Sequence, residues 1–193
     1  MTKVVTVNGS PRRKGNVDAL LRVAEEELEG LGVEVERISL SDYNVKPCEA
    51  CDVCSENAWE CPLDDDAVPL LRKLVEADAL IVGSPVYFGG VTAQLKALID
   101  RSAIPYQKSE LRGKIGAAIS CGGGRHGGQE LTVNQIITFF LMHEMTVASG
   151  EEGVFGAMGV ANDLGDIASD EEALSSSRAL ARRVAELLRE KGA

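Results

Sequence analysis

Four of the five cysteines of this chain lie between positions 48 and 61. Cys48, Cys51 and Cys54 are separated by two residues each, Cys61 follows after six more, and a proline stands directly behind it. Thiolates bind zinc and iron-sulfur clusters, and they also form disulfides. The chemistry of this segment therefore depends on which of these roles the spacing suits.

The spacing favours a 4Fe-4S cluster. Disulfides are disfavoured, because Cys48, Cys51 and Cys54 lie too close along the chain to pair well and a domain of this size in a reducing cytosol needs no cross-links. Structural zinc usually takes two cysteine pairs from separated elements. Three thiolates from seven consecutive residues suit a cubane cluster, and the gaps and trailing proline are typical of bacterial ferredoxins, with a longer last gap. Zinc and uncoordinated thiols stay open as alternatives, because spacing alone does not identify a metal.

A second candidate site follows the first expected strand, in the segment 8–17. It combines a glycine turn, a serine hydroxyl, cations at positions 12 to 14 and the start of a helix. Such a turn offers backbone N–H groups to an anion. The segment lacks the Gly-Lys-Ser/Thr of a nucleoside triphosphatase and the Gly-x-Gly-x-x-Gly of a dinucleotide fold. It predicts a phosphate-binding loop, with an ordinary strand-to-helix turn as the alternative; its candidate residues are Ser10, Arg12, Lys14, Gly15, Asn16 and Val17.

Two further loops have the composition expected around a flat ring. The loop after the third expected strand offers aromatic faces and flexible glycines, in Pro85, Val86, Tyr87, Phe88 and Gly89, unless these residues only cover the end of the sheet. The loop after the fourth strand is rich in glycine, in Gly122, Gly123, Gly127 and Gly128. This loop also matches the Gly-x-Gly-x-x-Gly pattern of dinucleotide-binding folds. The match is not interpreted as a dinucleotide site, because that pattern belongs to the first strand-helix turn. Cys121 is interpreted as a small buried residue and His126 as a polar loop residue.

The pattern along the chain predicts how these loops are placed. Five β-branched runs, at 3–9, 33–40, 79–84, 114–120 and 145–149, alternate with amphipathic segments at 16–32, 65–78, 92–102, 128–143 and 170–191. This alternation is typical of an α/β fold with a parallel sheet covered on both faces. Ligands of such sheets bind beyond the carboxyl ends of the strands, so we expect the three loops to meet. The long connections at 43–64 and 150–169 are expected to be functional or irregular.

The composition limits the classes of protein to which this chain can belong. With 193 residues, of which 45% are hydrophobic and 26% charged, we expect one globular domain over 1–193. No apolar run reaches the length of about 18 residues that a membrane span needs, and no signal peptide is evident, so we expect a cytoplasmic protein. The net charge of −10 disfavours binding to nucleic acid.

Four segments carry a family resemblance: "GSPRRKGN" at 9–16, "KPCEACDVCSENAWEC" at 46–61, "EADALIVGSPVYFGGVTAQLKALIDR" at 76–101 and "GGGRHGGQE" at 122–130. With them the chain resembles the NAD(P)H-dependent FMN reductase and flavodoxin-like superfamily, and the cysteine run resembles its iron-sulfur flavoprotein branch. The resemblance implies a flavodoxin-like three-layer sandwich with strand order 2-1-3-4-5 and the cysteine-bearing loop after strand 2. It also implies that FMN binds at the three loops. Val17 departs from the Thr or Ser common at its position and removes a hydroxyl donor.

The resemblance also implies a function. Single electrons from ferredoxin would pass through the cluster to FMN, and a pair would pass to a small acceptor such as O2, H2O2 or a quinone. The flavin would do the chemistry, so no side chain is expected to act as acid or base. We expect a homodimer or homotetramer in which one subunit's cluster lies near another's FMN. The alternatives are an NAD(P)H-dependent FMN or quinone reductase with structural cysteines, and a flavin carrier or redox sensor without turnover.

Overall fold

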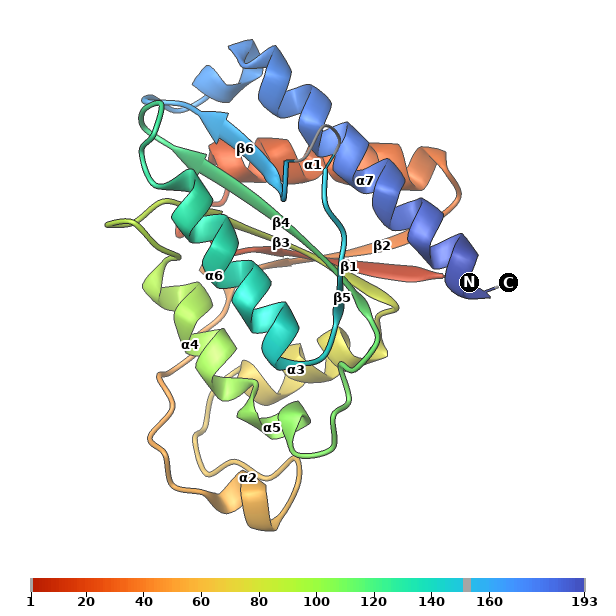
Figure 1. Ribbon diagram of the computed structural model, residues 1–193. Helices are drawn as coiled ribbons and strands as arrows, with labels where there is room; N and C mark the ends of the chain where they lie inside the picture. The colour runs from red at the N-terminus through yellow and green to blue at the C-terminus, as the bar shows by residue number, and fades with distance from the viewer. Residues whose placement is uncertain (1, 151–153, 193) are drawn as a thin grey trace.

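The computed structural model describes residues 2–150 and 154–192, and its strands form one parallel sheet (Figure 1). The strand order is β2-β1-β3-β4-β5, as predicted. The bounds are Lys3–Asn8 for β1, Glu34–Ser39 for β2, Ala79–Pro85 for β3, Ile115–Gly122 for β4 and Thr146–Val147 for β5. The predicted α/β, flavodoxin-like fold is confirmed.

Helices cover both faces of the sheet, so the fold has three layers (Figure 1). One face carries α1 (Asn16–Gly30) and α7 (Glu171–Gly192), and the other carries α3 (Ala67–Glu76), α4 (Ala93–Arg101), α5 (Ala103–Tyr106) and α6 (Gln129–Met142). Successive strand side chains point to opposite faces. Accordingly Ala79 and Ile81 of β3 lie in the core beneath α1 and α7, whereas Leu80 and Val82 lie in the core beneath α3 to α6.

The fifth position of the sheet differs from the prediction of one strand at 145–149. The two-residue β5 pairs only with Ile115 and Gly116 of β4, and a further strand, β6 (Ala157–Val160), pairs with the carboxyl half of β4. β6 was not predicted, because its short, glycine-containing sequence lacks the features of a strand. Glycine suits position 159, since a Cβ there would lie 2.4 Å from Cδ1 of Ile167, which would have to shift. The middle of the predicted irregular stretch 150–169 therefore completes the sheet, and residues 151–153 lie outside the described part.

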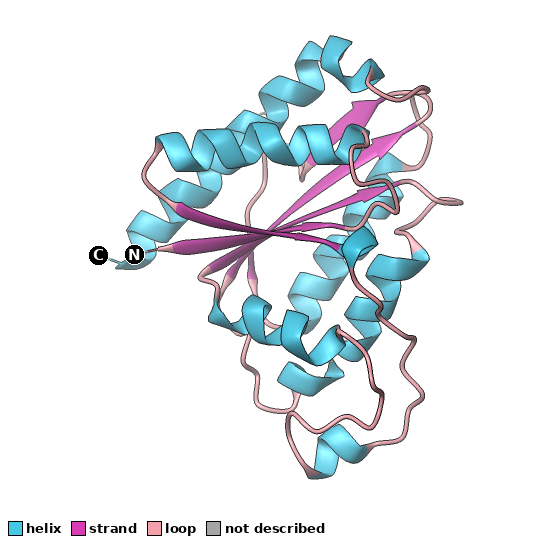
Figure 2. Cartoon of the chain, turned by 180° about the vertical axis from the view of Figure 1, so that it is seen from behind, coloured by secondary structure: helices cyan, strands magenta, loops and turns pink. Residues whose placement is uncertain are grey.

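The cysteine segment lies between β2 and α3, as predicted. The short 3-10 helix η1 (Leu40–Asp42) leads into it, and it contains the one-turn helix α2 (Val53–Glu56). Its two ends are joined where Asn44 and Asp66 exchange hydrogen bonds of 2.7 and 3.0 Å. In both Figures 1 and 2 the segment extends beyond α3 and α5, away from the sheet.

Across residues 2–150 and 154–192, the helices are too short or too polar for any of them to cross a lipid bilayer.

Candidate functional site

The three predicted ligand loops meet beyond the carboxyl ends of β1, β3 and β4. They line a hollow of about 170 Å³. Ten predicted residues line it: Ser10, Arg12, Gly15, Asn16, Val17, Pro85, Val86, Tyr87, Gly122 and Gly123. Lys14, Phe88, Gly89, Gly127 and Gly128 belong to the same loops but do not line the hollow. Cys121, Ala161 and Asn162 line it without having been predicted.

The start of α1 has the features of an anion site. Gly15 is the N-cap residue, and no side chain caps this helix. The N–H groups of its first turn therefore lack partners within the helix and face the loop. The Ser10 hydroxyl accepts a hydrogen bond of 3.1 Å from the backbone N–H of Arg12, which leaves its own hydrogen free to donate to a ligand. Arg12 is exposed and has no ion pair with the described residues, whereas the guanidinium of Arg13 binds Asp42.

Asn16 uses its side chain for another purpose than the predicted contact with phosphate. Its Nδ2 donates to the carbonyl oxygen of Asp163 at 2.9 Å, and its Oδ1 accepts from the N–H of Gly165 at 2.9 Å. These two bonds hold the segment 161–165 against the phosphate loop, which explains why Ala161 and Asn162 reach the hollow. The backbone N–H of Asn16 remains in the first turn of α1.

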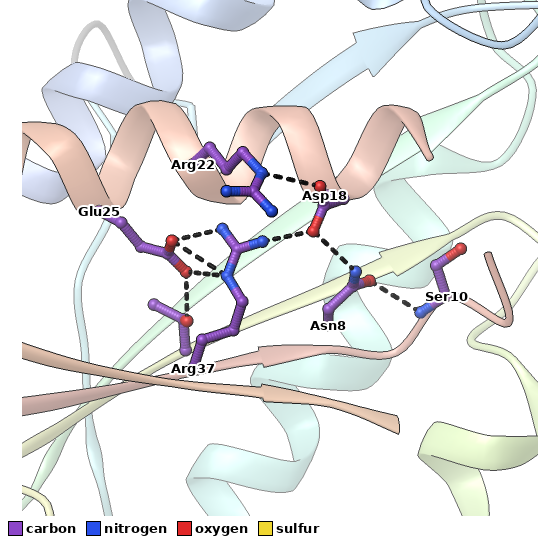
Figure 3. A network of polar contacts seen from close by, with 7 residues as sticks. Asn8, Ser10, Asp18, Arg22, Glu25 and Arg37 are labelled. Carbon is purple, nitrogen blue, oxygen red and sulfur yellow. Dashed lines mark hydrogen bonds and ion pairs between the residues drawn. The ribbon is translucent and has the colours of Figure 1, made fainter. Parts of the chain in front are cut away.

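A buried polar network supports the phosphate loop from behind (Figure 3). The Asn8 side chain accepts a hydrogen bond of 3.0 Å from the N–H of Ser10, and it contacts Asp18 at 3.5 Å. Asp18 lies in the first turn of α1, is 4% exposed, and binds Arg37 of β2 as well as Arg22. The two guanidinium groups neutralise a carboxylate that would otherwise oppose an anion at this helix end. The sequence analysis missed this network.

Arg37 extends the network to the middle of α1. Its guanidinium also binds Glu25 (Figure 3). Glu25 in turn accepts a hydrogen bond from the hydroxyl of Thr6 on β1. The side chains of Arg37 and Glu25 are 19% and 13% exposed. These contacts join β1, β2 and α1. They therefore hold both ends of the loop between β1 and α1 in place.

The loop after β3 presents two aromatic rings to solvent. Tyr87 and Gly90 exchange backbone hydrogen bonds of 2.8 and 3.1 Å, so the loop forms a tight hairpin with left-handed backbone at Phe88 and Gly89. Tyr87 is 46% exposed and Phe88 is fully exposed. Thr92, which caps α4, donates its hydroxyl hydrogen to the carbonyl oxygen of Gly9 at 2.6 Å. This hydrogen bond ties the loop after β3 to the loop after β1.

Cys121 faces the same hollow but is buried. Burial raises the pKa of its thiol to about 11. It is therefore protonated at neutral pH, which agrees with its interpretation as a small buried residue.

The four loop cysteines share one neighbourhood, and none forms a disulfide. Burial raises the pKa of Cys54 most strongly, and the charges of Cys48, Cys61 and Cys51 raise it further. Left-handed backbone at Ala50, between the first two cysteines, and at Asp52, between the next two, turns the chain at these points. Cys48 and Cys51 are exposed, and Cys54 and Cys61 are partly buried.

The identity of a metal at these thiols depends on how their sulfurs are arranged. Within the described part of the chain, no three His, Cys, Asp or Glu side chains are arranged to hold a metal ion. Zinc needs its sulfurs at about 2.3 Å from a single point. A cubane cluster instead spreads four thiolates over four irons. The prediction of a cluster therefore rests on the spacing of the four cysteines, and zinc stays the alternative.

Arg101, the last residue of α4, anchors the cysteine segment. Its side chain is 2% exposed, and its side-chain hydrogen bonds within the described residues go to that segment: Asp65 at 2.6 and 3.2 Å, the carbonyl oxygen of Lys46 at 3.1 Å and Sγ of Cys61 at 3.1 Å. Burial is the largest single influence on both groups and opposes their charges. The hydrogen bonds and charge attraction between the pair, with further hydrogen bonds from their neighbours, together outweigh it, so the pKa of Arg101 is raised and that of Asp65 is lowered. The sequence analysis did not identify either residue.

Trp59 packs the cysteine segment against the body of the protein. Its indole N–H donates to Glu110 at 3.3 Å, and Arg72 lies 4.5 Å above its ring. The ring also belongs to the partly buried margin of the core beneath α3 to α6. These contacts give Trp59 a packing role.

Larger hollows lie elsewhere. One of about 750 Å³ is bordered by the starts of α6 and α7 and by β6, one of about 460 Å³ lies among α4, α5 and α6, and one of about 530 Å³ lies beside Trp59 and Cys61 of the cysteine segment. None of these includes the uncapped start of α1, so the phosphate prediction stays with the smaller hollow.

Comparison with known proteins gives three results. The sequence model of the NADPH-dependent FMN reductase family matches residues 2–157. An iron-sulfur flavoprotein of Methanocaldococcus jannaschii is 43% identical over 189 residues, covering 97% of each chain, and an NAD(P)H dehydrogenase (quinone) of Nitrobacter winogradskyi is 37% identical over 98 residues, covering 50% of this chain and 49% of the other. The crystal structure of a flavodoxin, WrbA-like protein from Agrobacterium tumefaciens matches the fold with a TM-score of 0.65 and 18% identity, covering 98% of this chain and 99% of that one.

Proposed function

The chain belongs to the NADPH-dependent FMN reductase family, and we propose that it is an iron-sulfur flavoprotein oxidoreductase that uses FMN and a 4Fe-4S cluster. One observation supports this proposal: the same chain has a hollow at the uncapped start of α1, beyond the carboxyl ends of its strands, and a loop of four neighbouring thiols. The name of the 43% identical relative, iron-sulfur flavoprotein, supports the same pair of cofactors.

The residues of the hollow suit FMN. The N–H groups at the start of α1, the Ser10 hydroxyl and the Arg12 guanidinium would hold its phosphate. Pro85, Val86 and Tyr87 on one side and Gly122 and Gly123 on the other would flank its ring. The hollow is smaller than the roughly 300 Å³ of a typical complete ligand pocket, so the ring would extend over the exposed Tyr87. Bound FMN supplies a group that accepts one or two electrons.

Cys48, Cys51, Cys54 and Cys61 would hold the cluster. We propose that a one-electron donor such as ferredoxin delivers electrons there, and that FMN passes pairs to a small acceptor such as O2, H2O2 or a quinone. Five acidic side chains are exposed on this segment: Glu49, Asp52, Glu56, Glu60 and Asp64. They favour a donor whose docking face is positively charged.

We further propose that electrons cross between subunits of a homodimer or homotetramer. The helix α4 separates the two sites within one chain. It begins at the loop after β3, which borders the hollow, and it ends at the cysteine segment. Its nine residues span roughly 14 Å at about 1.5 Å per residue. The acidic cysteine segment of one copy would complement the exposed Lys14 of the loop after β1 and the exposed Arg125 of the loop after β4 in another copy.

The cofactor proposal is tested on anaerobically purified protein by its content of iron, sulfide, zinc and FMN, together with its absorption spectrum. About four iron and four sulfide per chain with bound FMN is the expected result. Stoichiometric zinc without sulfide, from an iron-replete source, would refute the cluster.

The electron route is tested by the rate at which the flavin bleaches. Reduced ferredoxin should bleach it and support catalytic consumption of an acceptor. Rapid bleaching by NAD(P)H alone would instead support an NAD(P)H-dependent quinone reductase, the second candidate, which is favoured by the name of the Nitrobacter relative. Bleaching by ferredoxin with no acceptor consumed would indicate a carrier.

The subunit route is tested with mixed dimers in which one subunit carries Cys51→Ala and the other is disabled in flavin binding. Each dimer then holds one cluster and one FMN on opposite chains, and ferredoxin should still reduce the flavin. No reduction in the mixture, with normal reduction in a monomeric variant, would exclude transfer between subunits.

A further inference from the structure

We propose that Arg101 raises the reduction potential of the cluster by holding its guanidinium against the sulfur of Cys61, and that Asp65 limits this effect. The inference rests on the proposed function, because it requires a cluster on the four cysteines. It assigns to a residue of α4, outside the cysteine segment, a role in setting how easily the cluster accepts an electron.

The geometry directs the guanidinium at one ligand. All four contacts of Arg101 are made by its two terminal nitrogens: Nη1 donates to the Lys46 carbonyl and to Asp65, and Nη2 donates to Asp65 and to Cys61. Lysine has a single nitrogen and cannot reproduce this planar fork. The bond to Asp65 is bidentate, so the guanidinium is fixed in the orientation that aims Nη2 at the sulfur.

Burial strengthens the electrostatic effect of the Arg101 charge on the cluster. The side chains of Arg101 and Asp65 are 2% and 0% exposed, so water and salt screen them little. One-electron reduction adds a negative charge to the cluster and its thiolates. A fixed positive charge that donates a hydrogen bond to a ligand sulfur stabilises the reduced form more than the oxidised form. The carboxylate of Asp65, which accepts a hydrogen bond from the same Nη2, acts in the opposite sense.

Arg101 and Asp65 are therefore expected to shift the reduction potential of the cluster in opposite directions. Arg101→Gln should lower the equilibrium constant for reduction at least tenfold, which corresponds to about 59 mV for a one-electron couple. Asp65→Asn should raise it. Arg101→Lys keeps a charge but loses the fork, and its potential should lie between those of the wild type and Arg101→Gln.

A matched control is available in Arg72→Gln. Arg72 is exposed and lies over Trp59 of the same segment, but none of its hydrogen bonds within residues 2–150 and 154–192 goes to a cysteine. Its removal takes away one positive charge beside the segment and should leave the potential unchanged, because solvent screens exposed charges.

The experiment is an anaerobic redox titration of the holoprotein followed by electron paramagnetic resonance, with iron, sulfide and FMN measured in every variant. Wild-type protein without iron and sulfide would contradict the proposed function itself. A full complement of iron and sulfide in Arg101→Gln, with the wild-type potential, would overturn only the role of Arg101. Loss of the cluster from Arg101→Gln, Arg101→Lys and Asp65→Asn alike, with FMN retained, would also overturn it, in favour of an anchoring role alone.

Discussion

Replacing Arg12 by alanine tests the phosphate loop directly. Arg12 lines the hollow beside the uncapped start of α1, and its guanidinium has no carboxylate partner among the described residues. A hydrogen bond between charged groups contributes about 1.5–3 kcal/mol. Arg12→Ala should therefore weaken FMN binding by roughly 10- to 150-fold, at 1.4 kcal/mol for each factor of ten. Because the side chain is exposed, the effect should shrink as the salt concentration rises.

Titration of apoprotein with FMN and with riboflavin, followed by flavin fluorescence, provides the assay. Riboflavin lacks the phosphate, so it should bind wild-type protein far more weakly than FMN does, and Arg12→Ala should not change its affinity. Arg13→Ala is the matched control, because Arg13 is also exposed but pairs with Asp42 and does not line the hollow. Equal affinity of the wild type for both flavins, or equal losses from the two arginine variants, would show that the phosphate lies elsewhere.

Three further predictions concern the cluster, the core and the charges. Cys51→Ala should lose iron and sulfide but keep stoichiometric FMN, because the hollow and the thiols are separate; joint loss of both cofactors would contradict this. Gly116→Ala should lower the free energy of unfolding by about 1–3 kcal/mol in denaturant titrations, since its Cβ would lie 2.6–2.8 Å from the Phe140 ring; an unchanged midpoint would count against this packing. Hydrogen bonds from Lys3 and Lys73 lower the pKa of Glu36 below 4.5, so Glu36→Gln should destabilise the protein at neutral pH. That difference should be complete above 4.5 and vanish as the pH falls through the lowered pKa of the folded state; a difference that persists there would contradict the pairing.

The sequence was sufficient to predict most of the sheet, because its inner strands are continuous apolar runs. β3 and β4 are buried over almost their whole length, and such runs are characteristic of parallel strands covered on both faces. The fifth position was not predictable in the same way. β5 and β6 have two and four residues, and it is the free edge of β4 that makes them strands. Their own composition specifies no strand.

The candidate site was predictable where it depends on local loops and not where it depends on distant pairs. The phosphate loop is contiguous, so its glycine, serine and cations were visible in the sequence. The bond from Asn16 to Asp163 joins residues 147 positions apart, and no local pattern indicates it. Arg101 did leave a signal, because it lies three residues after Leu98 and six after Leu95, on the buried face of α4. A charged residue in such a position requires a buried partner, and here that partner is Asp65.

The two candidate sites are coupled through α4. At its start, Thr92 binds the carbonyl oxygen of Gly9 in the phosphate loop, and at its end Arg101 binds Cys61 and Asp65 of the cysteine segment. The central apolar residues of the helix pack into the core beneath α3 to α6, so the helix does not move independently of the sheet. One rigid helix thus fixes the separation between the hollow and the thiols within each chain. In the proposed route between subunits, a second copy of the chain would bring a flavin and a cluster closer together than the two ends of α4 lie within one chain.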